Sequence, residues 1–256
     1  MREVLCWYLM YKINILPEEI ESLPLGAFPG EIKVISAPGL EYDKAIFYLA
    51  RQKVLGFDTE TRPVFSPGHR QHGVALLQLS GPDKAYLFRV QSLGMRTLLC
   101  RILSSKRILK VGAAVLDDVR GLQRYAAFEA RGFVDLQKIA WEWGIRDKSV
   151  KKLSANIMGC RISKAQQLSN WEADALSPSQ QLYAATDAWI CREMYLKLLA
   201  SDKHPLSLEE RNPVVAQPKS ETPAPETPAK KKPLRRHHRG GRFKKSGHDQ
   251  IVPQEG

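Results

Sequence analysis

The chain has 256 residues, a hydrophobic content of 43% and a formal net charge of +12. This length suits one domain of ordinary size with tails, or two small domains, and the hydrophobic content supports a folded core. No apolar run approaches the roughly 20 residues that a membrane-spanning helix needs. The opening residues 1–10 are too short and too interrupted for a signal peptide. We therefore expect a protein without membrane contact.

The cysteines show no metal-binding or disulfide pattern. Cys6, Cys100, Cys160 and Cys191 are scattered and contain no CxxC pair. This spacing favours reduced thiols over a disulfide framework or a zinc site. We therefore expect a cytoplasmic protein.

Most of the positive charge lies near the C-terminal end. Nine basic residues and no acid occur between residues 228 and 248, namely Lys230, Lys231, Lys232, Arg235, Arg236, Arg239, Arg242, Lys244 and Lys245. The preceding stretch is rich in Pro, Thr, Glu and Ala, and it cannot bury enough surface to offset the entropy of ordering. We therefore predict an N-terminal extension over 1–30, a folded domain over 31–203, a disordered linker over 204–229 and a disordered basic tail over 230–256.

In the first half of the chain, periodicity predicts mainly strands. In chain order these elements are a helix over 16–23, a strand over 31–35, a helix over 41–52, and strands over 54–61, 74–80 and 84–90. Gly81-Pro82-Asp83 joins the last two strands as a hairpin.

In the second half, helices and strands alternate. They are predicted as helices over 93–103 and 115–125, a helix that runs through Trp143, helices over 148–158 and 177–200, and strands over 108–113 and 133–136, with an ordered loop over 159–175. Strands in hairpin order followed by β-α-β crossovers indicate an α/β fold, in which helices flank a mixed sheet.

Two carboxylates stand at the end of the strand that begins at Val54. Successive strand residues alternate faces, so Asp58 and Glu60 project from one side and Thr59 from the other. Two like charges beside a core are costly unless a partner neutralises them, and a divalent cation held by oxygen ligands would do so. The alternative is a strand that runs out into a solvated acidic turn.

The following loop, 62–73, contains two histidines. His69 and His72 suggest metal ligands, but the carboxylates already supply enough ligand atoms. We interpret both histidines as ordinary loop residues that can contact a substrate.

A second acidic position lies on the predicted helix 115–125. Val115, Val119 and Leu122 define its buried stripe, which includes Asp118 but not Asp117. The alternative is a slightly rotated helix whose first turn both aspartates cap.

The long helix 177–200 carries a third acidic position. Tyr183 and Asp187 are four residues apart and share a face that continues into the apolar residues Ile190, Cys191 and Met194. An aspartate without a partner is costly on such a face, so we expect a ligand there. A structural tyrosine–aspartate pair that caps the core is the alternative.

These motifs together resemble the DEDDy 3′–5′ exonuclease family, which includes RNase D and Werner-type exonuclease domains. The matching stretches are Phe57-Asp58-Thr59-Glu60, then Lys110-Val111-Gly112 leading to Asp118, then Tyr183-Ala184-Ala185-Thr186-Asp187-Ala188. Lys164, Ser169-Asn170-Trp171, Leu176 and Gln181 resemble the stretch before the third motif. The resemblance covers residues 31–199 and implies a ribonuclease H-like fold.

The resemblance implies a role for each matched residue. Asp58, Glu60 and Asp187 would ligate a first divalent ion, Asp58 would bridge to a second ion near Asp118, and Tyr183 would orient the attacking water. Oxygen-only ligands favour Mg²⁺ or Mn²⁺ over zinc. The expected activity is hydrolytic release of nucleoside 5′-monophosphates, one at a time, from the 3′ end of single-stranded or 3′-recessed DNA or RNA.

The sequence departs from the family in two places. Asp174-Ala175-Leu176 stands where many relatives carry Arg-Pro-Leu, which removes a positive charge from the expected substrate path. The helical accessory domain of RNase D has no counterpart in the stretch after residue 203. A stand-alone domain of the Werner-like branch is therefore the better match.

The basic tail suggests contact with nucleic acid. Lys and Arg gain affinity for phosphates by releasing counterions, and Arg-Gly segments stack on single strands. We expect the tail to hold nucleic acid near the nuclease, whereas the alternative is a solvated tail without that role. For the domain itself, the alternative function is a non-catalytic nucleic-acid-binding module on the same fold.

Overall fold

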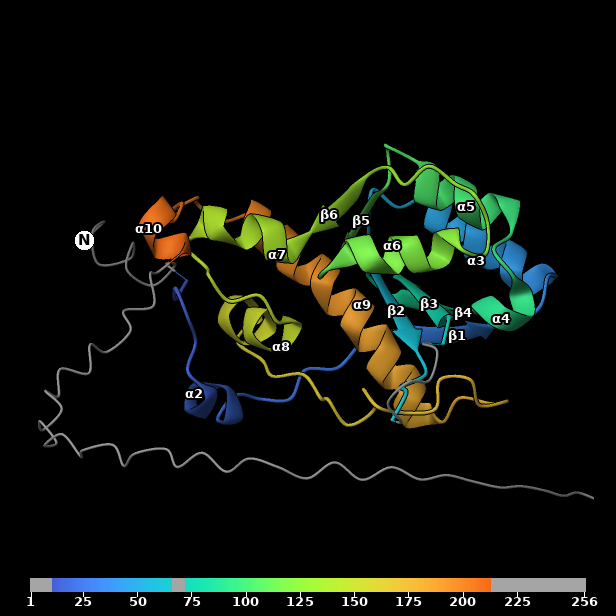
Figure 1. Cartoon of the computed structure of the whole chain (residues 1–256), viewed down its shortest axis with the longest axis horizontal. Coiled ribbons are helices and arrows are strands. Elements are labelled where there is room, and N and C mark those ends of the chain that lie inside the picture. The colour runs from blue at the N-terminus through green and yellow to red at the C-terminus, as the bar shows by residue number, and fades with distance from the viewer. Residues whose placement is uncertain (1–10, 66–71, 213–256) are drawn as a thin grey trace, which may run out of the picture. The chain divides into compact units, whose positions relative to one another are not determined.

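The structure is a computed structural model that describes residues 11–65 and 72–212. Cys6, His69, most of the predicted linker and the basic tail lie outside the described residues. The described part is built on a six-stranded sheet (Figure 1). Its strands are β1 (Glu31–Ile35), β2 (Val54–Thr61), β3 (Val74–Ser80), β4 (Lys84–Arg89), β5 (Leu109–Gly112) and β6 (Phe133–Asp135).

The strands follow the order β1-β4-β3-β2-β5-β6. β3 pairs antiparallel with both β2 and β4, whereas β1 is parallel to β4, and β5 is parallel to both β2 and β6. The predicted mixed sheet is confirmed. β2 therefore lies inside the sheet, where backbone pairing on both sides holds the strand that carries Asp58 and Glu60.

Helices cover both faces of the sheet. They are α2 (Pro17–Glu21), α3 (Leu40–Ala50), α4 (Val90–Leu93), α5 (Thr97–Ser104), α6 (Val115–Gln123), α7 (Leu136–Ile139), α8 (Val150–Leu153), α9 (Pro178–Leu199) and α10 (Leu208–Arg211), with a 3₁₀ turn over Ala140–Trp143 and a π turn over Ser154–Met158. α3, α5 and α6 lie on one face, and α9 crosses the other (Figure 1). None of these helices has the length and apolarity to cross a membrane.

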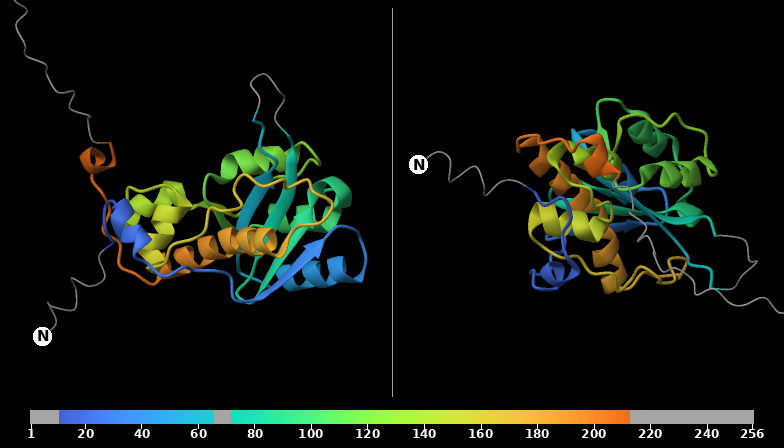
Figure 2. Two further views of the ribbon diagram at one scale, coloured as in Figure 1. Left: turned by 90° about the horizontal axis from the view of Figure 1, so that it is seen from below. Right: turned by 60° about the vertical axis from the view of Figure 1, so that its left-hand side comes forward.

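The apolar core is divided between the two faces. Leu55 and Phe57 of β2 are fully buried against α3, α5 and α6. On the opposite side, Ile190 and Met194 of α9 pack against α7 and α8, which lie beyond the edge of the sheet (Figure 2). α9 thus touches the sheet with its first half and the smaller helices with its second half.

α9 approaches β2 very closely at Gly56. A Cβ atom built on Gly56 would lie 1.9 Å from the carbonyl oxygen of Ala188. Only glycine fits this contact, because any side chain would overlap the backbone of α9. The contact brings the backbone of α9 next to the strand two residues before Asp58.

Two predicted helices are interrupted in the structure. The helix predicted over 93–103 is wrong at its start, because Gly94 adopts φ +70° and separates α4 from α5. The helix predicted over 148–158 changes into a π turn at Ser154. Apolar spacing alone does not reveal either interruption, since both stretches keep a helical period.

The packed part extends beyond both predicted domain boundaries. Leu206 is buried, and its N–H donates to the carbonyl of Trp141, so the ordered chain continues past Lys203 into α10. Near the other boundary, the Phe28 N–H donates to the Thr186 hydroxyl at 3.0 Å. Residues 11–30 therefore pack on the domain that was predicted to start at residue 31.

Candidate metal centre

Three carboxylates converge where β2 meets α9. Asp58, Glu60 and Asp187 each offer an oxygen, and these oxygens all lie within 4.8 Å of one another. The first two project from the α9 side of β2, as strand alternation predicts, and the third lies on α9 itself. All three side chains are half-buried. The structure thus brings together three of the four acids that the sequence singles out.

The fourth acid, Asp118, stands apart from these three. It lies on α6, and its Oδ1 accepts a hydrogen bond of 2.5 Å from the Thr59 hydroxyl, on the other face of β2. The Asp117 side chain is 88% exposed, whereas Asp118 is half-buried. Of the two neighbouring acids, the structure therefore turns Asp118 inward, as its place on the buried stripe predicts.

A turn fixed by Asp135 positions Asp118. Ala114, just before α6, adopts φ +60°, the left-handed region that a residue with a Cβ adopts only at a cost. The buried Asp135 carboxylate accepts from the Ala114 N–H at 3.0 Å and from the Gln137 N–H at 3.1 Å. Asp135 thereby ties the start of α6 to the end of β6.

The N-terminal cap of α9 places Tyr183 and Asp187. The Ser177 hydroxyl accepts from the Gln180 N–H, the Gln180 side chain accepts from the Ser177 N–H, and Pro178 occupies the first helical position. Tyr183 then follows in the second turn, and its ring centroid lies 5.9 Å from that of the fully buried Trp171. Tyr183 therefore lies one helical turn before Asp187 on α9.

Burial and mutual repulsion raise the pKa values of the clustered carboxylates. Burial raises the pKa of Asp58 and of Glu60, and the charges of Asp187 and Asp118 raise both further. Burial also raises the pKa of Asp187, although the Tyr183 hydroxyl and Lys164 oppose that shift. These four acids thus repel one another in a region that water screens poorly.

The same surroundings act on Asp118 and Tyr183. Burial raises the pKa of Asp118 to about 6, although the hydrogen bond from Thr59 lowers it. Burial and the neighbouring Asp187 raise the pKa of the Tyr183 hydroxyl, so that it stays protonated at neutral pH. Asp118 remains close enough to Asp58 for its charge to raise the pKa of that carboxyl.

The donor set fits a hard divalent cation. The three clustered side chains are all carboxylates, and their mutual repulsion is relieved when a cation lies between them. His72 does not belong to this group, because its Nδ1 lies 3.2 Å from the carboxylate of Glu172. This position agrees with our interpretation of His72 as a loop residue.

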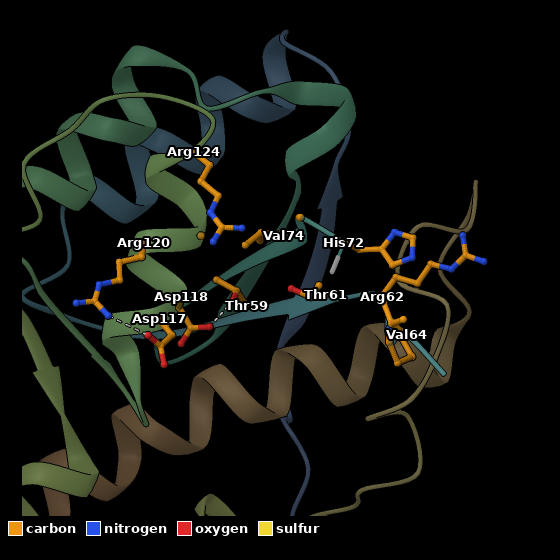
Figure 3. Close-up of a pocket in the computed structure, with 13 residues that line it drawn as sticks. Thr59, Thr61, Arg62, Val64, His72, Val74, Asp117, Asp118, Arg120 and Arg124 are labelled. Atoms are coloured by element: carbon orange, nitrogen blue, oxygen red, sulfur yellow. Dashed lines mark hydrogen bonds and ion pairs between the residues drawn. The ribbon is translucent and has the colours of Figure 1, made fainter. Parts of the chain in front are cut away.

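Two pockets open beside the carboxylates. The larger, of about 670 Å³, lies between α6 and the segments that flank the loop after β2, and Thr59 and Asp118 contribute to its wall (Figure 3). The smaller, of about 200 Å³, is lined by Tyr183 and Asp187 together with other polar and apolar residues, such as Gln166 and Leu182. Asp118 is therefore accessible from the larger pocket and Asp187 from the smaller one.

Sequence reasoning missed several polar groups of this region. The amide of Gln78 is fully buried and unpartnered among the described residues, and Gln78 pairs in register with Asp58. Arg120 and Arg124 line the larger pocket. Their spacing of four residues on one helix predicts a shared face, so the sequence did contain a signal for these two arginines.

Comparison with known proteins shows which family the chain belongs to. Residues 40–201 match the 3′–5′ exonuclease family. The bifunctional 3′–5′ exonuclease/ATP-dependent helicase WRN of Mus musculus is 32% identical over 193 residues, which cover 70% of this chain and 13% of that protein. Exonuclease 3′–5′ domain-containing protein 2 of Mus musculus is 31% identical over 211 residues, which cover 72% of this chain and 32% of that protein.

A solved structure shows the same fold. The exonuclease domain of Aedes aegypti Nibbler superposes with a TM-score of 0.60 at 20% identity, over 68% of this chain and 91% of that one. The predicted ribonuclease H-like fold is thereby confirmed. The chain spans less than a third of the length of either curated relative.

Proposed function

The chain belongs to the DEDDy-type 3′–5′ exonuclease family, and we propose that it is an active, metal-dependent member that removes nucleotides one at a time from the 3′ end of a nucleic acid. The observation that carries this proposal is the convergence of Asp58, Glu60 and Asp187 within 4.8 Å. Mutually repelling carboxylates that gain stability only with a cation are what a metal-dependent hydrolase needs. A purely structural acidic turn would leave its carboxylates in solvent.

In the proposed mechanism, each residue of the site has a separate task. Two Mg²⁺ or Mn²⁺ ions, when bound, supply a water that is deprotonated near neutral pH and stabilise charge on the leaving 3′ oxygen. Asp58, Glu60 and Asp187 would hold one ion. Asp118, which lies outside the three-carboxylate group, would help to hold the second ion together with Asp58.

Tyr183 positions the attacking water in this proposal. Its hydroxyl stays protonated because burial raises its pKa, so it can donate a hydrogen bond and accept another. It lies one turn from Asp187, on the same face of α9. The buried Trp171 beside its ring limits how far the ring can move.

The test is degradation of 5′-labelled single strands of RNA and DNA with Mg²⁺ or Mn²⁺. We expect a ladder that shortens from the 3′ end, and Asp58→Asn should abolish it. Asp43→Asn is the matched control, because Asp43 is an exposed aspartate on α3 and lies outside the three-carboxylate group. Absence of a ladder on both strands with either ion would favour a binding module without catalysis.

The proposal includes the tail and the cellular location. The basic residues 230–245 would hold nucleic acid near the domain, and they lie outside the described residues. Cys100, Cys160 and Cys191 are free thiols in the described part of the chain, which supports a reducing compartment such as the cytoplasm.

A further inference from the structure

The pocket beside Asp118 carries an unusual concentration of arginines. Arg120 extends from α6, Arg124 directly follows that helix, and Arg62 extends from the segment after β2 (Figure 3). The pocket volume of about 670 Å³ is within the range of small-molecule and cofactor sites. Apart from Asp118, its acidic lining consists of the exposed Asp117.

The three arginines differ in how well they are paired. Arg124 is exposed and makes no ion pair with any residue of 11–65 or 72–212. Arg120 pairs with Asp117 at 3.4 Å, and Arg62 pairs with Glu172 at 3.3 Å. Exposed pairs of this kind contribute little, whereas a guanidinium and a phosphate form strong bidentate hydrogen bonds. A phosphate can therefore engage Arg124 directly and draw the other two arginines away from their acids.

The pocket adjoins the metal centre at Thr59 and Asp118, whereas the three clustered carboxylates are not among its lining residues. Thr59 and Asp118 form part of its wall, and Thr59 immediately follows Asp58 in β2. In Figure 3, β2 runs between α6 and α9, and Arg124 points from the end of α6 toward the space above Thr59. The pocket therefore begins one residue along β2 from Asp58, next to the proposed position of the terminal phosphodiester.

We propose that this pocket binds the phosphates on the 5′ side of the scissile bond, with Arg124 as the principal contact and Arg120 and Arg62 beside it. The ligand is the phosphodiester backbone of a nucleic-acid strand, recognised without regard to base sequence. This inference rests on the proposed exonuclease function, since it assumes that the scissile bond lies at the three-carboxylate group.

Binding is tested first, under conditions without cleavage. The affinity of a fluorescently labelled single strand is measured by anisotropy with Ca²⁺ at several salt concentrations, for the wild type, Arg124→Gln, Arg124→Lys and Arg101→Gln. Arg101 is an exposed arginine on α5, outside the pocket, and serves as the matched control. We expect Arg124→Gln to weaken binding about tenfold and to reduce the slope of log K against log salt by about 0.7. Arg124→Lys should restore part of both.

Catalysis is tested on two substrates. The p-nitrophenyl ester of thymidine 5′-monophosphate has no phosphate on the 5′ side of the scissile bond, so Arg124→Gln should impair its hydrolysis much less than that of the single strand. For the single strand, the same variant should raise KM and keep kcat. If wild-type protein cleaves neither substrate, the proposed function fails, whereas the anisotropy experiment still reports on the pocket.

Two results would overturn the inference. One is a strand affinity and salt slope of Arg124→Gln that equal those of Arg101→Gln. The other is an equal loss of affinity for thymidine 5′-monophosphate and for the strand, which would make the pocket a site for the free mononucleotide instead. Circular dichroism establishes that each variant is folded, which is expected because both arginines are exposed.

Discussion

Asp117 and Asp118 are adjacent acids of α6 with different surroundings, and they offer a matched pair of variants. Asp118 accepts from Thr59 and raises the pKa of Asp58 by its charge, whereas Asp117 points to solvent. We expect Asp118→Asn to lower kcat by about 100-fold, because a group that orients a metal ion or its water is removed. Asp117→Asn should change kcat less than about twofold.

The measurement is steady-state hydrolysis of a labelled strand over a range of Mg²⁺ or Mn²⁺ concentrations. Equal rates for Asp118→Asn and wild type would exclude Asp118 from the second metal position. A restored rate at higher metal concentration would instead show that Asp118 acts mainly on metal affinity.

Glu60 links the metal centre to folding stability. Burial and two neighbouring acids raise the pKa of the Glu60 carboxyl above 4.5, its ordinary value. Above that value the unfolded chain releases this proton more readily than the folded protein, so the free energy of unfolding falls as the pH rises. We expect metal-free protein to melt several degrees lower at about pH 8 than at about pH 6.

Glu60→Gln should reduce this pH dependence and raise the melting temperature of metal-free protein at about pH 8. Mg²⁺ should raise the melting temperature of wild type but have much less effect on the variant. Thermal unfolding followed by circular dichroism, with EDTA or Mg²⁺, checks both expectations. If Glu60→Gln melts below metal-free wild type at the higher pH, the ionised Glu60 carboxylate does not destabilise the metal-free protein.

The sequence predicted the relative orientation of acidic residues wherever that orientation depends on local backbone geometry alone. Strand alternation placed Asp58 and Glu60 on one side, and the spacing of four placed Tyr183 and Asp187 on one face. The bond between Thr59 and Asp118 was beyond the sequence, since it depends on how α6 packs against β2. The sequence also did not predict the buried, unpartnered amide of Gln78, because the burial of a side chain depends on the tertiary packing around it.

At the scale of elements, the contact between β2 and α9 determines the metal centre. Gly56→Ala would place a Cβ atom 1.9 Å from the Ala188 carbonyl oxygen and force α9 away from the strand. We expect a decrease of about 3 kcal/mol in the free energy of unfolding and a large decrease in activity, because Asp187 would move with α9.

Urea unfolding and strand hydrolysis measure the two effects of Gly56→Ala. Gly159→Ala is the control, because Gly159 has a positive φ of +69° but open space around its Cβ position. That control should be destabilised by only about 1 kcal/mol, from backbone strain, and keep its activity. Equal effects of the two variants would show that the close approach of α9 has no role of its own.

Element types were predicted better than element ends. Apolar periodicity identified all six strands and the long helix, since these elements bury a regular face. The break at Gly94 and the π turn after Ser154 were missed, because a helical apolar period continues through both.

At the scale of the whole molecule, the sheet order brings distant parts of the chain together. β2 carries two of the acids, while α9, which follows more than 100 residues later, carries another and crosses the same sheet. The mixed order of strands was predictable from the hairpin and the later alternation of helices and strands. The packing of residues 204–212 was not, since its few anchors, such as Leu206, are scattered in a polar stretch.

The role of the basic tail can be tested by truncation, and the structure determines where to end the chain. A protein that ends at Ala200 would lack Leu206 and Arg211, which pack on Trp141 or hydrogen-bond to it. A protein that ends at Asn212 retains both residues and removes all nine basic residues between 228 and 248. Truncation after Asn212 therefore separates removal of the tail from damage to the fold.

We expect the truncated protein to bind a single strand more weakly and with a smaller salt dependence, the slope falling by about 0.7 for each phosphate that the tail neutralises in the full chain. Its kcat on the p-nitrophenyl ester should be unchanged, whereas KM for long strands should rise because the tether no longer concentrates substrate near the metal centre. A variant that lacks residues 213–229 but keeps the basic tail controls for chain length and should bind almost as the full chain does. If truncation leaves both affinity and salt slope unchanged, the strand is held by the folded domain alone, and the arginines beside Asp118 become the main electrostatic binding site.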